Sequence, residues 1–205
     1  GRLELGRWLA SADHPLTARV MVNRIWQGHF AKGLVRSPDN FGRLGDRPTH
    51  PQLLDWLAVH FMQQNWSIKA MHRLIMQSST YRMSTSYDKK AALADPDNRL
   101  LWRMNRRRLE AEAIRDSIFA VAQTLDSDMG GSLLKTENRK YVTSTANVDP
   151  VVYKNSRRSI YLPVVRSALY NVFQAFDFAD PSVLNGKRSS TTVAPQALFM
   201  MNSEL

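Results

Sequence analysis

Apolar residues recur every three to four positions along most of the chain, which predicts a mainly helical protein. The strongest repeat runs from residue 14 to residue 30, HPLTARVMVNRIWQGHF. Leu16 and Val20 lie on one side of this segment, and the opposite face carries Ala18, Met21, Val22, Ile25, Trp26 and His29. We therefore predict a central helix that its neighbours enclose on most sides.

Shorter apolar repeats predict helices before and after this segment. Pro51 follows His50 as Pro15 follows His14, and proline suits the first helical position because its missing N–H is not needed there. Ser67 is a predicted N-cap. The expected helices span residues 3–11, 51–65, 68–81, 109–126 and 168–178, and a last helix begins at Pro195.

The remaining segments lack the helical repeat. Residues 31–51 are dense in Gly, Pro, Asp and Asn, which predicts a long ordered loop, and the polar stretch 82–99 is the predicted mobile segment. Residues 140–150 and 157–165 alternate and are rich in β-branched and aromatic side chains, so they predict a small β-hairpin with Pro163 on an edge strand. The expected fold is mainly α: an irregular multi-helix domain with a long ordered loop and a small β-hairpin in the C-terminal half.

Length and composition fit one domain over residues 1–205, because 205 residues with 43% hydrophobic content can bury a substantial core. Within it we expect a helical core over 1–126 and a hairpin-containing region over 127–205. The chain starts at Gly1 and stops inside a predicted helix, so we expect it to be a piece of a larger multidomain protein. No run approaches the roughly 18 apolar residues of a membrane span, and the absence of cysteine excludes disulfides and thiolate metal sites.

Three polar residues occupy positions that the helical pattern predicts to be buried. Arg19 and Asn23 lie between the two apolar sectors of the central helix, and Arg115 lies within the apolar face of 109–126. An unpaired buried charge costs several kcal/mol, so each needs partners from the protein. We expect the partners of Arg19 and Asn23 to fix the loop that follows the central helix.

The chain carries 28 Lys and Arg against 18 Asp and Glu, a net charge of +10, and 20 of the basic residues are arginine. Arginine pairs bidentately with carboxylate, phosphate or sulfate. These residues could therefore pair with internal acceptors or form a surface that binds a polyanion. Their scatter along the whole sequence favours internal pairing.

No pattern in the chain specifies a reaction. The five histidines form no H-x-x-x-H or H-E-x-x-H pair, so we expect no metal site and no cofactor held by this segment. The serines and threonines lack a G-x-S-x-G context. Glu110 and Glu112 are flanked by Arg108 and Arg115, and ordinary helix salt bridges explain them better than acid–base catalysis.

Three stretches of this chain resemble a known family. They are HPLTARVMVNRIWQGHFAKGLVRSPDNFGRLGDRPTHPQLLDWLA, the later RRRLEAEAIRD, and the closing FDFADPS with RSSTTVAPQALFMMNS. They resemble the planctomycete-type domain of unknown function that closes large cytochrome-c-linked proteins. The resemblance implies an exported protein, periplasmic or at the cell surface, in which haem belongs to a neighbouring domain. It implies no reaction, ligand or catalytic residue.

The candidate site is an arginine-centred polar constellation, read either as a structural network or as an anion-binding cleft. Its members are Arg19, Asn23, Asp39, Asn40, Arg43, Arg106, Arg107, Glu110 and Arg115. The leading hypothesis is a non-catalytic helical scaffold or interaction module that contacts neighbouring domains of the same polypeptide and an anionic extracellular polysaccharide. The alternatives are a hydrolase acting on an anionic substrate between the central helix and the 31–49 loop and, as the weakest, a nucleic-acid-binding domain.

Overall fold

The computed structural model describes residues 1–131, 133, 153–164, 169–203 and 205. The chain divides into two compact units, Gly1–Arg107 and Arg108–Leu205. This boundary lies before the helix predicted over 109–126, and not at residue 126 where the apolar period changes. Within the described residues, no helix has the length and apolarity needed to cross a membrane.

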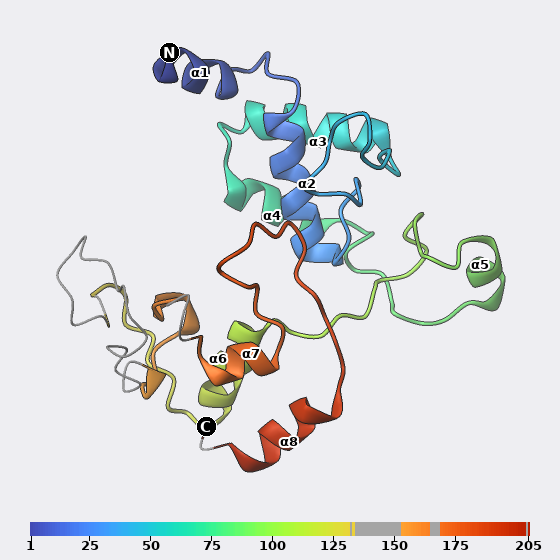
Figure 1. Cartoon of the computed structure of the whole chain (residues 1–205). Coiled ribbons are helices and arrows are strands. Elements are labelled where there is room, and N and C mark those ends of the chain that lie inside the picture. The colour runs from blue at the N-terminus through green and yellow to red at the C-terminus, as the bar shows by residue number, and fades with distance from the viewer. Residues whose placement is uncertain (132, 134–152, 165–168, 204) are drawn as a thin grey trace. The chain divides into compact units, whose positions relative to one another are not determined.

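Unit 1 contains five helices, and three of them form its core. Helix α2 packs against α3 and α4 (Figure 1). The buried residues at this junction include Val22, Phe30, Phe61 and Met71. The helices of unit 1 are α1 (Arg2–Leu9), α2 (Thr17–Phe30), α3 (Pro51–Gln63), α4 (Ile68–Gln77) and α5 (Lys89–Ala94).

The central helix is confirmed, and most of its surface is covered as expected. Ala18, Val22, Ile25 and Trp26 of the predicted face are buried. On the opposite side Val20 is half-buried, and within α2 only Arg24 and Gly28 are exposed. Helix α2 is therefore enclosed on most sides, with Arg24 facing solvent and Asn23 fully buried.

Local sequence explains where the helices of unit 1 begin and end. Pro51 starts α3, and the Ser67 hydroxyl accepts a hydrogen bond from the Ala70 amide at the start of α4. Helix α2 ends where Ala31 adopts a left-handed conformation with φ 63°. The stretch predicted to be mobile contains α5, whose N-cap Asp88 accepts a hydrogen bond from Ala91.

Unit 2 is built on α6 (Ala111–Val121). A short 3₁₀ helix, η3 (Ser159–Tyr161), and the helices α7 (Asn171–Ala175) and α8 (Ala194–Asn202) complete its described part. Its core joins Ala111 and Leu162 to Val172, Phe173 and Phe176 of the α7 region. The helix predicted over 168–178 is thus confirmed in type but is shorter than expected.

The predicted β-hairpin is not supported. Its first strand, 140–150, lies outside the described residues, and the described part of its second strand contains η3 and one isolated bridge between Asp126 and Arg157. The physical reason lies in α6, because Asp116 accepts hydrogen bonds from the Ser159 amide at 2.8 Å and from its hydroxyl at 2.6 Å. Helix side chains thus bind the backbone groups that a partner strand would have bound.

Candidate functional site

Asn23 holds the start of the long loop against α2. Its side chain is 0% exposed. The Asn23 Nδ2 group donates to the Val35 carbonyl at 3.0 Å, and Asn23 Oδ1 accepts from the Val35 amide at 2.9 Å. One side chain therefore satisfies both backbone groups of a buried loop residue, which would otherwise cost the desolvation of each.

Gly33 makes this close approach possible. A Cβ atom at Gly33 would lie 2.5 Å from the Val35 carbonyl oxygen and 2.6 and 2.7 Å from the two polar atoms of the Asn23 amide. Real Cβ atoms do not come so close to backbone, so any larger residue must displace the loop. The far end of the loop closes on the same turn, where the Thr49 amide donates to the Leu34 carbonyl at 2.9 Å.

Arg19 lies near Asn23 in the sequence but does not hold the loop. Its Nε donates to Asp55 Oδ1 on α3 at 2.7 Å, and it also donates to the Pro15 carbonyl. The Arg19 side chain is 38% exposed, and that of Asp55 is more open still. The expectation that both polar residues of α2 pin the loop is therefore met by Asn23 and is wrong for Arg19, which links two helices at the surface.

The loop members of the predicted constellation contact the loop itself or the exposed side of α2, or face solvent. Asn40 Oδ1 accepts from the Gly42 amide at 3.0 Å, and the Asn40 carbonyl accepts from Ser37. Asp39 lies 4.0 Å from Arg24, with both side chains more than half exposed. Arg43 is exposed. The structure does not bring these residues to Asn23, so they form no single cleft with it in the described contacts.

Residues 105–107 terminate α2 from a distant part of the chain. Arg107 donates to the Gly28 carbonyl and Asn105 Nδ2 to the Phe30 carbonyl, both in the last turn of the helix. The last carbonyls of a helix lack partners within it, and basic side chains suit this end. Arg107 is therefore a helix-capping residue, although it is exposed to solvent like its neighbour Arg106.

Arg115 is the most deeply buried charge among the described residues of unit 2. It is 0% exposed, and its guanidinium donates to the Arg157 carbonyl at 2.7 Å and to the Asn155 carbonyl. Its carbon Cζ lies 4.6 Å from the centre of the Phe119 ring, a cation–π distance. The apolar face of α6 thus accommodates an arginine because that arginine binds the backbone of the segment leading to η3.

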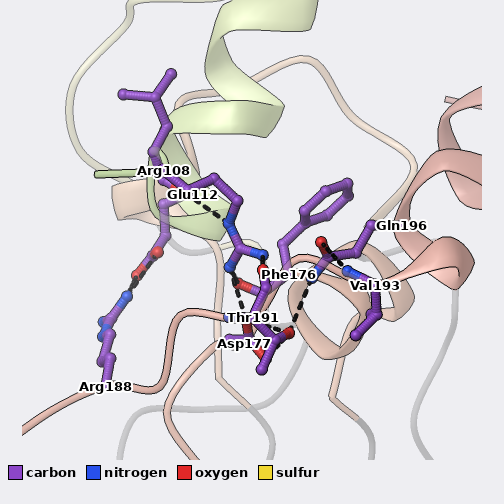
Figure 2. A network of polar contacts seen from close by, with 9 residues as sticks. Arg108, Glu112, Phe176, Asp177, Arg188, Thr191, Val193 and Gln196 are labelled. Atoms are coloured by element: carbon purple, nitrogen blue, oxygen red, sulfur yellow. Dashed lines mark hydrogen bonds and ion pairs between the residues drawn. The ribbon is translucent and has the colours of Figure 1, made fainter. Parts of the chain in front are cut away.

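A second polar network in unit 2 surrounds Asp177 (Figure 2). Arg108 donates to Asp177 Oδ2 at 2.8 Å and to the Phe176 carbonyl at 3.0 Å. The Thr191 amide donates to the same carboxylate at 2.7 Å, and Gln196 of α8 donates to the Thr191 hydroxyl at 3.2 Å. The network ties the start of unit 2 to the segments before and within α8.

The two glutamates at the start of α6 both form salt bridges with Arg188. Arg188 Nη1 lies 2.8 and 2.7 Å from the two oxygens of Glu112 (Figure 2). It also lies 3.3 Å from Glu110. The hydrogen bond to Glu112 raises the pKa of Arg188 above its ordinary value, against the opposing effect of burial. The carboxylates therefore hold the loop that carries Arg188, and Glu110 is exposed.

The Asp177 carboxylate makes the stability of unit 2 depend on pH, in a direction that its hydrogen bonds fix. The Thr191 amide lowers the pKa of Asp177, burial opposes this, and the Thr191 hydroxyl and Arg108 lower it further. A folded-state pKa below the unfolded value of about 3.9 stabilises the protein above that pH, and the contribution is lost as the pH falls through the folded value.

We expect Asp177→Asn to lower the free energy of unfolding by about 1–2 kcal/mol near neutral pH, because the amide accepts fewer charge-assisted hydrogen bonds. The loss should shrink below pH 4. Urea unfolding at both pH values measures it, and Asp128→Asn at an exposed position serves as the control. An equal loss at both pH values would contradict the assigned role of the charge.

Sequence reasoning did not assign the Asp177 network. Asp177 and Thr191 are far from Arg108 in sequence, and periodicity says nothing about pairs outside helices. A usable signal was present, since Asp177 and Thr191 lie in FDFADPS and RSSTTVAPQ, two of the stretches that carry the family resemblance. Pairing the charged and hydroxyl residues of those stretches with the arginines of RRRLEAEAIRD would have predicted this network.

Two histidines of unit 1 meet across two helices. His29 Nε2 of α2 lies 2.7 Å from His72 Nδ1 of α4, and the His29 ring also contacts Tyr81 edge-on. His60 is stacked on Trp56 instead. No group of three or more His, Cys, Asp or Glu side chains suited to a metal ion is found among the described residues.

The excess charge is concentrated in one unit. Unit 1 holds 17 Lys and Arg against eight Asp and Glu, a net charge of +9, whereas unit 2 holds 11 against ten, a net charge of +1. The acidic residues are thus divided almost evenly between the two units, whereas more of the basic residues lie in unit 1. Unit 1 is the part of the chain whose charge its own residues do not balance.

Unit 1 also presents an arginine that lies over one exposed and one half-buried aromatic ring. Arg103 Cζ lies 4.6 Å from the centre of the Trp102 ring and 5.6 Å from that of Tyr87, which is 68% exposed. Buried Asp95 and Asn98 fix this segment, since the Asp95 carbonyl accepts from the Trp102 indole at 2.9 Å and Asn98 donates to the Arg103 carbonyl at 2.8 Å. The stack is therefore held in place by its own loop.

A family model described as PSD1, a protein of unknown function (DUF1553), matches residues 1–205, the whole of this chain. Comparisons with curated proteins and with solved structures found no match. The description of this family assigns no activity to its members.

Proposed function

This chain belongs to that family of proteins of unknown function, and we propose that it is a non-catalytic helical interaction module whose unit 1 contacts an anionic polymer. The polymer would be an extracellular polysaccharide bearing carboxylate or sulfate groups. The module would be part of an exported, cytochrome-c-linked multidomain protein, with haem held by a neighbouring domain.

The internal pairing of the buried and half-buried polar residues supports a non-catalytic role. Asn23 binds Val35, Arg115 binds backbone carbonyls, and Asp177 binds Arg108 and Thr191. An enzyme site needs polar groups that converge on a substrate with some of their hydrogen-bonding capacity free. The hydrolase reading is weaker because Asp39, Asn40 and Arg43 do not converge with Asn23 on a common space.

The proposed contact with a polymer rests on a single observation, the net charge of +9 on unit 1. Arg43, Arg73, Arg82, Arg99 and Arg106 are all exposed there. Planar guanidinium groups bind carboxylate and sulfate bidentately. Arg103 on its aromatic support adds a fixed group, because ring stacking orients its N–H donors without the entropy cost of ordering a free side chain.

We expect the full chain to bind heparin and polygalacturonate at about 0.15 M salt, where charges beyond about 8 Å are screened. Binding should be tighter than to double-stranded DNA at the same salt. Isothermal titration calorimetry at increasing salt measures all three. Arg43→Gln and Arg106→Gln should each weaken polysaccharide binding a few-fold, whereas Arg158→Gln, at an exposed site in unit 2, should not.

A second pair of variants tests the aromatic support. Tyr87→Ala should weaken polysaccharide binding, and Trp56→Ala, which removes an exposed ring on α3 without a stacked arginine, should leave it unchanged. Equal affinity for DNA, with all binding lost at modest salt, would reduce the contact to generic charge attraction. That result would contradict the proposal.

A further inference from the structure

His29 and His72 form an imidazole pair between two helices of unit 1. Helix α2 supplies His29 in its last turn, and α4 supplies His72 near its middle. The Nε2 and Nδ1 atoms face each other at 2.7 Å, and the ring planes meet at 66° with centroids 5.0 Å apart. His72 is exposed, so water and ions reach the pair.

The two facing ring nitrogens of this pair have lone pairs that can bind a metal cation in place of a proton. A hydrogen bond between two ring nitrogens needs one donor and one free lone pair, so the two rings cannot both be fully protonated while it exists. A metal ion binds the free lone pair of a neutral imidazole, and the two facing nitrogens of this pair offer such lone pairs to one ion.

We propose that His29 and His72 are the two protein ligands of a divalent transition-metal site, with water in the remaining coordination positions. Zinc–nitrogen bonds of about 2.0–2.1 Å in tetrahedral geometry place two ligand nitrogens about 3.3 Å apart. The pair would have to open by only about 0.6 Å from its present contact. Rotation of the exposed His72 side chain supplies that opening. The metal takes the place of the shared proton, which moves to the outer nitrogen of the ring that carried it, so both imidazoles stay neutral.

The chemistry of the ligands selects the class of metal. Imidazole suits Cu²⁺, Ni²⁺ and Zn²⁺, whereas Mg²⁺ and Ca²⁺ require oxygen ligands. No third His, Cys, Asp or Glu joins this pair within the described residues, which leaves an open and moderately tight site. Arg107 is the charged neighbour that acts on His29, and its positive charge opposes the binding of a dication.

Titration of the full chain with Cu²⁺ and with Zn²⁺ tests the site, read out by calorimetry and by electron paramagnetic resonance of the copper form. We expect a copper signal with two imidazole nitrogens and a rise in Tm on Zn²⁺ addition, because the metal bridges α2 to α4. His29→Gln and His72→Gln should each lower the affinity by about tenfold or more. His60→Gln removes a histidine of the same unit and should change it by less than about twofold.

Two further measurements separate this site from adventitious copper binding. Affinity should fall as the pH is lowered below the imidazole range, because protons compete for the same lone pairs. Arg107→Gln should tighten binding by removing the opposing charge. Equal losses for His60→Gln and His72→Gln, or a single-nitrogen copper signal, would overturn the proposal, and none of these outcomes depends on the polymer contact.

Discussion

Replacing Arg115 by methionine will lower the free energy of unfolding by about 3–5 kcal/mol, as expected when one partner of a buried charged network is removed. Methionine fills much of the same space, so the loss comes from the acceptors that remain. The carbonyls of Asn155 and Arg157 and the carboxylate of Asp116 would then lie beside an apolar side chain.

Urea unfolding followed by circular dichroism measures this loss. Arg158→Met is the matched control, because Arg158 lies in the same segment but is exposed. Substitutions at such sites usually change stability by no more than about 0.5 kcal/mol. An Arg115→Met variant within 1 kcal/mol of the parent protein, by the same scale, would show that the guanidinium does not hold this segment.

Replacing Asn23 by alanine will destabilise unit 1 by about 2–4 kcal/mol, because the buried amide and carbonyl of Val35 would each lose their partner. Gly33→Ala should cost about 1–3 kcal/mol by a different cause, the overlap of the new Cβ with the Val35 carbonyl and the Asn23 amide. The two losses should not add, since both substitutions disturb the same contact.

A substitution at Gly28 is a control that should raise the free energy of unfolding, whereas Gly33→Ala should lower it. It lies in α2, is exposed, and has nothing within 4 Å of an added Cβ. Gly28→Ala should therefore stabilise the protein by about 0.5–1 kcal/mol, since alanine favours the helix and restricts the unfolded chain. Thermal and urea unfolding of the variants measure both signs, and a neutral Gly33→Ala would contradict the close packing of the loop against Asn23.

The sequence predicts helix positions well because apolar periodicity is a local property. It identified the buried face of α2 and the need of Asn23 and Arg115 for partners, since both follow from residues on one helix. It failed for the hairpin, because Asp116 binds Ser159 from another element. It also missed the His29–His72 pair, whose members are separated by 43 positions in the chain.

The division of charge between the two units also could not be predicted from the sequence. Basic residues are spread along the sequence, which favoured internal pairing, yet unit 1 carries almost the whole excess. The unit boundary at Arg107 cannot be found from composition, because it depends on which residues pack together. Arg43 and Arg106 remain exposed, whereas Arg107 and Arg115 bind carbonyls, and only tertiary contacts distinguish these arginines.

The central claim is that the buried polar side chains hold the protein's own backbone and not a ligand. Hydrogen exchange of the Val35 amide tests it most directly, followed by nuclear magnetic resonance with and without added sulfate. We predict slow exchange in the parent protein, fast exchange in Asn23→Ala, and no shift of the Asn23 side-chain amide signals on sulfate addition. Rapid Val35 exchange in the parent, or Asn23 signals that move with sulfate, would contradict it.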